Sequence, residues 1–374
     1  MSYHPTACPD CLRRARLLSH LAPYMEKCLA RSAKGRLATQ LLRLGNEDLA
    51  AAVAPDIASQ LLEHVAAVSD DELQTEIAES SHWCCCQHDP QFPAVLGQTP
   101  GAPWALFGSG DPLRLARLHP KGAVAIVGSR RADTYGRELA RTLGRDLAGA
   151  GLAVISGLAF GIDSCAHRGA LEAGTTAAVL GCGVDVPYPA SHRSLWRRIC
   201  EEGLVISELP LGSTPWRWTF PARNRIVAAL AAMTIVVEAA ERSGSLVTAD
   251  LAADLGRDIG AVPGPVNSRG SAGTNALLSK GACLIRDAQD VLDAMLGPGV
   301  KRAGPAGPQP GRTQREVLAA LKDGAQSLEE IVGDTDLPRE EARRGLDSLA
   351  ALGYVEVHST FRYRPSGLEP PLAH

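Results

Sequence analysis

The residues best suited to chemistry follow the ends of short apolar runs. Gly128, Ser129 and Arg130 come directly after the run Ala123–Val127, and a helical pattern begins near Tyr135. Glycine lets a ligand approach the backbone, the amides after it are expected to point outward, and the start of a helix favours negative charge. The guanidinium group of Arg130 suits phosphate. The segment therefore predicts a phosphate site, although Arg130 could equally belong to a solvated loop.

A second glycine-bearing loop follows the apolar run at 152–156. Ser156 and Gly157 open this loop, and a helical pattern comes after it. Because neighbouring parallel strands end at the same edge of a sheet, both loops are expected at one ligand-binding rim. We favour Asp163 as the cap of the helix over a binding role. His167 has no paired nucleophile, so we expect it to pack or to face solvent.

A third candidate segment combines an aromatic ring with strong hydrogen-bond donors. Phe220 is followed by Arg223, Asn224 and Arg225 at the predicted start of a helix. Phosphate contacts beside a ring that stacks on bases favour single-stranded nucleic acid. The alternative is an internal ion pair between one arginine and an acidic residue at a strand end, so we expect at least one arginine to be structural. The acidic residues at strand ends are Glu208 and Glu238.

Ten cysteines are present, and two groups of them are close in sequence. Cys8 and Cys11 form one CxxC pair, and Cys84, Cys85 and Cys86 are consecutive. Two such groups could bind zinc, but a second CxxC pair and a well-spaced histidine pair are both missing from the sequence. We therefore expect reduced thiols and no metal.

The glycine-bearing loops also disfavour two classes of nucleotide-binding enzyme. The sequence G-x-x-x-x-G-K-[ST] of a P-loop hydrolase is missing from the loop after 123–127. The G-x-G-x-x-G motif with an acidic residue about 20 positions on, which nicotinamide-dependent oxidoreductases use, is missing as well. A nucleotide or phosphoribosyl hydrolase stays open as an alternative to a nucleic-acid-binding protein, because fold alone does not decide function.

Six short apolar runs alternate with helical segments between residues 121 and 297. Gly or Pro follows several of the runs. This rhythm predicts a parallel sheet with helices on both faces, which is an extended Rossmann-like α/β core. The runs are Ala123–Val127, Leu152–Ser156, Thr176–Leu180, Leu204–Ser207, Thr234–Val237 and Ile259–Val262.

Regions of different composition flank this core. Residues 1–86 show helical leucine spacing and predict an N-terminal helical domain, and the proline-rich stretch 87–120 is interpreted as a connector. Residues 298–311 predict a Gly/Pro-rich linker. Three helical patterns and a hairpin predict a winged-helix-like domain at 312–365, and 366–374 are expected to be a disordered tail.

The overall composition excludes a disordered chain. Of the 374 residues, 45% are hydrophobic, which is enough for a full-sized core. The net charge of -3 means that a nucleic-acid site needs a local basic patch. Neither a targeting segment nor an apolar run long enough to span a bilayer is evident, so we expect a cytoplasmic protein without membrane contact.

Together the motifs identify a family. In order along the chain stand VGSR, SGLAFGID, GCGVDVPYP, SELPLG, FPARNRIVAAL, SGSLVTA and VPG. With these motifs the chain resembles DNA-processing protein A, the DprA/Smf family, over about residues 90–297. The three-part layout with a C-terminal winged-helix-like unit also resembles that family.

The resemblance implies a homodimeric protein that binds and protects single-stranded DNA and loads the RecA recombinase during natural transformation. It implies neither an enzyme nor a cofactor. Many family members have a basic residue just after the Tyr-Pro of the third loop, where this chain has Ala190, and Arg193 is the nearest replacement. The implied DNA-binding residues are Gly128, Ser129, Arg130, Ser156, Gly157, Arg223, Asn224 and Arg225.

Overall fold

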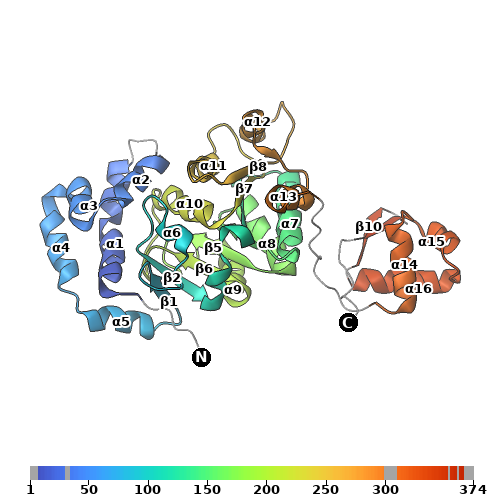
Figure 1. Cartoon of the computed structure of the whole chain (residues 1–374), viewed down its shortest axis with the longest axis horizontal. Coiled ribbons are helices and arrows are strands. Elements are labelled where there is room, and N and C mark those ends of the chain that lie inside the picture. The colour runs from blue at the N-terminus through green and yellow to red at the C-terminus, as the bar shows by residue number, and fades with distance from the viewer. Residues whose placement is uncertain (1–6, 30–33, 299–309, 353, 360–361, 366–374) are drawn as a thin grey trace. The chain divides into compact units, whose positions relative to one another are not determined.

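The computed structural model describes residues 7–29, 34–298, 310–352, 354–359 and 362–365 (Figure 1). The chain forms two compact units, Met1–Lys301 and Arg302–His374. Residues 299–309 of the predicted linker and the predicted tail 366–374 lie outside the described residues.

A nine-stranded sheet forms the centre of the first unit, with the order β1-β2-β6-β5-β4-β3-β7-β8-β9. The six predicted strands are confirmed, each to within one residue at either end, because their apolar runs are flanked by Gly, Pro or polar residues. The strands are β1 (Trp83–Cys86), β2 (Ala105–Gly110), β3 (Ala123–Val127), β4 (Ala153–Ser156), β5 (Thr176–Leu180), β6 (Leu204–Ser207), β7 (Met233–Val236), β8 (Asp258–Ala261) and β9 (Cys283–Leu284).

The seven strands from β6 to β9 are parallel, which confirms the predicted α/β class with a mainly parallel sheet. β1 and β2 extend this block at one edge in antiparallel pairing. The prediction differs here, because it placed residues 83–86 in a helical domain and 105–110 in a connector. Both segments are short apolar runs near prolines. They become strands because they pair with each other and because β2 also pairs with β6, which is distant in sequence.

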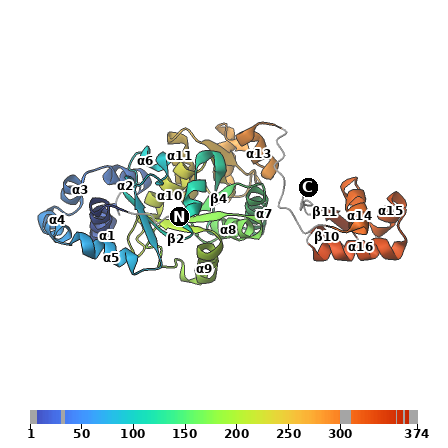
Figure 2. The same ribbon diagram turned by 60° about the horizontal axis from the view of Figure 1, so that its bottom comes forward.

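Helices cover both faces of the sheet, as predicted (Figure 2). One face packs against α7, α8 and α9, and the other face packs against α10 and α11. Glycines in α7 and α8 face the partner helix's backbone so closely that a Cβ has no room, which holds the two helices together. The helices are α6 (Ala94–Gly97), α7 (Thr134–Gly149), α8 (Ile162–Ala173), α9 (Arg193–Glu202), α10 (Thr219–Leu230), α11 (Gly244–Asp254), α12 (Ala272–Ser279) and α13 (Ala288–Leu296).

The N-terminal helices lie beside the edge of the sheet that β1 and β2 form (Figure 1). Their apolar side chains share a core with Trp218, at the start of α10. The Trp218 indole N–H donates to the Ala22 carbonyl over 3.0 Å, so these helices are packed onto the sheet unit. They are α1 (Pro9–Leu29), α2 (Lys34–Leu42), α3 (Asn46–Val53), α4 (Ala58–Ala66) and α5 (Asp70–Ala78).

The second unit contains three helices and a two-stranded antiparallel hairpin, the elements that the sequence predicts there. A separate core forms between them, centred on Val317, Ile331, Leu346 and Leu349. The elements are α14 (Arg312–Lys322), α15 (Leu328–Asp334), α16 (Arg339–Ala351), β10 (Val355–Ser359) and β11 (Arg362–Pro365). Within the described part of the whole chain, every helix is too short or too polar to cross a bilayer.

Candidate nucleic-acid interface

A hollow opens at the carboxyl edge of the parallel sheet, over the loops that follow β3, β4 and β5. The start of α10 closes one side of it. The sequence therefore predicted correctly that two glycine-bearing loops share one rim. The side chains and glycines that matter most in its lining are Arg130, Gly157, Phe160, Tyr188, Pro189 and Phe220.

An exposed cation and three aromatic rings gather at this hollow. The Arg130 guanidinium carbon lies 5.3 Å from the centroid of the Phe220 ring, a cation–π distance. The Tyr188 ring packs against the same Phe220 ring, with 5.3 Å between the two ring centroids. Phe160 is 47% exposed and Tyr188 is 40% exposed. Large aromatic side chains held this open to water offer flat apolar faces to a ligand.

The loop after β3 uses its amides internally. The Ser129 N–H donates to the Glu238 carbonyl over 2.7 Å, and the Arg131 N–H donates to the Ser129 hydroxyl over 3.1 Å. A Cβ on Gly128 would lie 2.5 Å from the Ile162 side chain, so the glycine is needed for packing against α8. The expectation of outward-pointing amides is therefore wrong for these two residues, and Arg130 is left to contact an anion.

The loop after β4 is tied down in the same way. The Gly157 and Ala159 amides donate to the Asp163 carboxylate over 3.1 and 3.4 Å. Asp163 thus holds the loop, and the predicted helix cap is wrong because Gly161 occupies the N-cap of α8. Burial raises the pKa of the Asp163 carboxyl, while Arg223 and the two amides act to lower it.

Ser156 is fully buried, and its hydroxyl donates to the Ile126 carbonyl over 2.6 Å. Its predicted contact with DNA is therefore wrong. A serine at the last position of a central strand satisfies its hydroxyl on the neighbouring strand instead of facing the rim.

Arg223 lies beneath the hollow rather than inside it. The side chain is buried and donates to the Val179 carbonyl, and a Cβ on Gly157 would overlap its guanidinium group. Its Nε has no hydrogen-bond partner among the described residues. Burial lowers the pKa of Arg223 to about 10, with Asp163 acting to raise it, so the group stays charged at neutral pH. Gly157 thus separates a buried positive charge from the hollow.

Arg225 is also structural, which confirms the expectation for at least one of the two arginines. Its guanidinium group lies 2.5 Å from the Glu208 carboxylate, and both side chains are largely buried. Further donation goes to the carbonyls of Gly101 and Ala222 over 2.8 and 2.9 Å. Asn224 is half-buried, and its side chain makes no hydrogen bond within the part of the chain that the structure describes.

Glu238 occupies the point where the strand order reverses, between β3 and β7. Its carboxylate accepts from the Asp133 amide over 3.0 Å. Burial raises the pKa of this carboxyl, the Asp133 amide opposes the change, and the Asp133 carboxylate adds to it. Open α/β sheets commonly bind ligands at this crevice. Here the carboxylate and the loop amides close it, so the hollow lies to one side, over β3–β5.

Comparison with known proteins decides the family. The model of the family described as DNA recombination-mediator protein A matches residues 83–296, more than half of the chain. The chain belongs to this family. Protein Smf of Synechocystis, a relative, is 34% identical over 315 residues, covering 74% of this chain and 78% of that protein.

Other members of the family are similar at the level of sequence or structure. The putative DNA processing protein DprA of Mycobacterium tuberculosis is 44% identical over 254 residues, which cover 65% of this chain but only 64% of that protein. The X-ray structure of DprA from Streptococcus pneumoniae superposes with a TM-score of 0.58 at 34% identity, covering 73% of this chain and 96% of that one.

A second family structure concerns DNA directly. DNA processing protein A from Helicobacter pylori, whose structure is described by its unique single-stranded DNA binding mode, superposes with a TM-score of 0.51. It is 31% identical to this chain and covers 57% of it, with 95% of its own length matched.

Two aromatic residues that line the hollow were not predicted from the sequence. Phe160 and Tyr188 were not among the predicted site residues. Aromatic residues make up only 4% of the chain, and these two stand directly before Gly161 and Pro189. Such rare rings in glycine- and proline-bearing loops are the signal that could have found them.

The basic residue that many family members have after Tyr-Pro is replaced here by Ala190, and Arg193 is the nearest basic side chain. Arg193 is exposed at the start of α9, whereas the neighbouring His192 is buried against the Leu158 carbonyl.

His167 is a core residue, one of the two roles that its sequence context favours. The ring is fully buried, and Nδ1 lies 2.7 Å from the Thr176 hydroxyl. Because that hydroxyl donates to the Val154 carbonyl, the imidazole Nδ1–H is the donor. Burial lowers the pKa of His167 to about 3, and the charges of Arg223 and His192 act in the same direction.

This environment predicts an acid-dependent loss of stability. In the unfolded chain a histidine has a pKa of about 6.5, so the depressed native pKa stabilises the fold fully above that pH. As the pH falls from about 6 to about 3, His167 should lower the free energy of unfolding by about 1.4 kcal/mol per pH unit, because only the unfolded chain takes up its proton. Urea unfolding at several pH values should show a shallower decline for His167→Gln. The same change at exposed His119 should leave the slope as in the parent, and parallel slopes for all three proteins would contradict the role of His167.

Proposed function

We propose that this chain binds single-stranded DNA in the hollow over β3–β5. The observation that carries the proposal is the exposed Arg130 stacked on Phe220, with the open rings of Phe160 and Tyr188 beside it. A charged group for phosphate next to aromatic faces for bases is the arrangement that single-strand binders use. The description of the Helicobacter family structure by its single-stranded DNA binding mode supports the same ligand.

We propose separate tasks for the side chains of the hollow. Arg130 would pair with a phosphate, and the buried charge of Arg223 would add positive potential through Gly157, which carries no side chain. Phe160 and Tyr188 would stack on bases. The loop amides are engaged by Glu238 and Asp163, so they would fix the position of the arginine instead of binding the strand. Stacking tolerates every base, so the sequence preference should be weak.

Binding fits this hollow better than hydrolysis of a nucleotide. None of the described residues that line it is Asp, Glu or His. A hydrolase needs a general acid, a general base or metal ligands within reach of the scissile bond. The nearby Asp163 carboxylate is buried and accepts two loop amides, which supports a structural role.

Membership of the family supports a wider role. We infer that the protein protects incoming single-stranded DNA and loads RecA onto it during natural transformation, acting as a homodimer in the cytoplasm. The identity of 34–44% to DprA and Smf proteins supports this role. Light scattering of the purified chain tests the dimer, and strand exchange by RecA with and without the protein tests the loading.

The C-terminal unit, which we propose to be a winged-helix-like domain at 312–365, is better suited to protein contact than to duplex DNA. Two arginines on α16 are paired with acidic side chains: Arg339 lies 2.7 Å from Glu329, and Arg344 lies 3.7 Å from Glu340. A helix that reads duplex DNA needs an excess of unpaired positive charge. We therefore propose a partner-binding or regulatory role for this unit.

A salt titration tests the DNA site. The affinity for a labelled oligothymidylate, measured by fluorescence anisotropy, should fall steeply as salt rises. Arg130→Ala should weaken binding about tenfold and reduce the slope of log affinity against log salt by about 0.7, the contribution of one phosphate contact. Arg198 on α9, paired with Glu202 at the surface, provides a control of equal charge change. If Arg198→Ala weakened binding as much as Arg130→Ala, the effect would be one of net charge and the proposed site would be wrong.

A further inference from the structure

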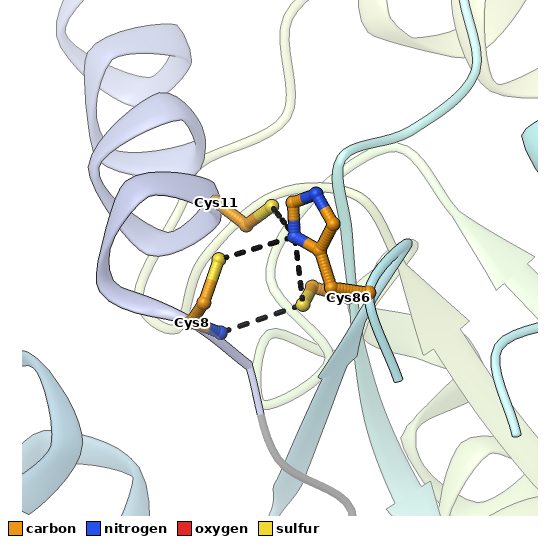
Figure 3. Close-up of side chains that lie close together, drawn as sticks. Cys8, Cys11 and Cys86 are labelled. Atoms are coloured by element: carbon orange, nitrogen blue, oxygen red, sulfur yellow. Dashed lines mark hydrogen bonds between the residues drawn. The ribbon is translucent and has the colours of Figure 1, made fainter. Parts of the chain in front are cut away.

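Four side chains with metal-binding atoms meet where α1 begins and β1 ends. Cys8 precedes α1, Cys11 lies in its first turn, and Cys86 is the last residue of β1 (Figure 3). His88 follows in the turn after the strand and completes the group. The expectation of no metal was based on the missing second CxxC pair, but Cys86 and His88 supply the two further ligands.

The distances within this group match those around a single tetrahedral ion. The sulfurs of Cys8, Cys11 and Cys86 lie 3.3, 3.6 and 3.8 Å from Nδ1 of His88, and all four atoms are within 4.8 Å of one another. Zinc holds sulfur at about 2.3 Å and nitrogen at about 2.0–2.1 Å. Tetrahedral angles then place sulfur and nitrogen about 3.6 Å apart and two sulfurs about 3.8 Å apart.

We propose that Cys8, Cys11, Cys86 and His88 bind one zinc ion in a closed structural site. Four protein ligands of the Cys₃His type fill the coordination shell, so no position is left for a substrate. The site would tie the beginning of α1 to the edge strand, with Cys8 and Cys86 78 positions apart in sequence. This inference does not depend on the proposed DNA binding, because Cys8 and Cys11 precede residue 83, where the family match begins.

The donor set selects among metals. Thiolate sulfur is a soft ligand that favours zinc, copper(I) or iron–sulfur clusters, whereas magnesium and calcium prefer oxygen. A cluster with several irons would spread its four ligands further apart than the observed group, which is compact enough for one ion. The tetrahedral S₃N arrangement is one of the usual donor sets for structural zinc.

Surrounding backbone groups support ligation. The Cys8 amide donates to the sulfur of Cys86 over 3.4 Å, the kind of outer contact that stabilises a metal-bound thiolate. The turn that presents His88 is closed by the Asp89 amide, which donates to the Cys86 carbonyl over 2.8 Å. Cys84 has its sulfur directed to the Cys85 carbonyl and does not belong to the group.

The test is the zinc content of the full chain, expressed without a polyhistidine tag and measured by plasma mass spectrometry. We expect about one zinc per chain in the parent protein. Cys8→Ser and His88→Ala should lose most of it, and both sites are open enough for the fold to accept the change. His88→Cys should retain zinc, because it creates the equally common Cys₄ donor set. Cys28→Ser, an exposed thiol on the same helix, should retain it as well.

Cobalt provides a second readout that does not depend on stability. The apoprotein loaded with Co²⁺ should show the visible absorption of tetrahedral cobalt and the near-ultraviolet band of thiolate-to-metal charge transfer, and Cys8→Ser should weaken both. The proposal would be overturned by a parent protein that is folded yet holds no zinc and shows no tetrahedral cobalt spectrum. It would be overturned equally by a Cys8–Cys11 disulfide in the freshly isolated protein, or by equal zinc in the parent and Cys8→Ser.

Discussion

Replacing Arg225 by methionine is expected to lower the unfolding free energy of the first unit by about 3–5 kcal/mol. Arg225 is 3% exposed, and its partner Glu208 is 12% exposed. Removing the cation leaves a buried carboxylate without its counter-charge, and the Gly101 and Ala222 carbonyls lose their donors. Because Arg225 anchors α10, the same loss loosens the helix that positions Phe220 and Arg223.

Tryptophan fluorescence during urea unfolding measures this effect. All five tryptophans of the chain precede residue 219, so the signal reports on the first unit alone. The surface pair of Arg141 and Glu172 is a matched control, with the same 2.5 Å separation but much greater exposure. Arg141→Met should change little, because exposed ion pairs contribute little. The double change Arg225→Met and Glu208→Leu should recover part of the loss. A loss for Arg225→Met as small as that for Arg141→Met would show that the buried pair does not hold α10.

The order of strands and helices in the core could be predicted from the sequence because each element carries its own signal. The run Ala123–Val127 is apolar throughout, as a strand covered on both faces requires, and Gly128 marks its end. β1 and β2 have no such local signal. β1 pairs with β2, and β2 pairs with β6, so both strands depend on contacts between segments that are distant in sequence. The prolines around them point to a connector instead.

The site could be predicted only at the level of loops. Arg130, Arg223 and Arg225 are chemically identical, yet one is exposed and the other two are buried. The sequence could not distinguish them, because burial depends on Val179 in β5 and on Glu208 just after β6, which lie outside α10. Ser156 was misassigned for the same reason, since its acceptor Ile126 belongs to the adjacent strand.

Backbone amides show how a correct motif can carry a partly wrong mechanism. Glycine-bearing loops after parallel strands do meet at one rim, as expected. However, Glu238 and Asp163 lie behind those loops and accept their amide hydrogens. The loops therefore act as rigid supports, and in the proposed function recognition depends on the side chains in front of them, which are Arg130 and the aromatic rings.

Removing the two exposed rings together, Phe160→Ala with Tyr188→Ala, is expected to weaken single-stranded DNA binding by about a hundredfold or more. Stacking of one base on one aromatic ring contributes about 1–3 kcal/mol. Both rings are substantially exposed, so the fold should tolerate their loss. Tyr188→Phe keeps the ring and should bind as the parent does, which separates stacking from any role of the hydroxyl. Anisotropy titrations with the same oligothymidylate at fixed salt measure the affinities.

The salt dependence makes this prediction independent of the one for Arg130. The slope of log affinity against log salt counts the phosphates that the protein neutralises, and aromatic rings neutralise none. The double variant should therefore bind weakly with the parent's slope, whereas Arg130→Ala should lower both. Parent-like affinity in the double variant would show that the bases do not stack in the hollow. A reduced slope would show instead that the rings act only by holding Arg130 in place, through the contact between Tyr188 and Phe220.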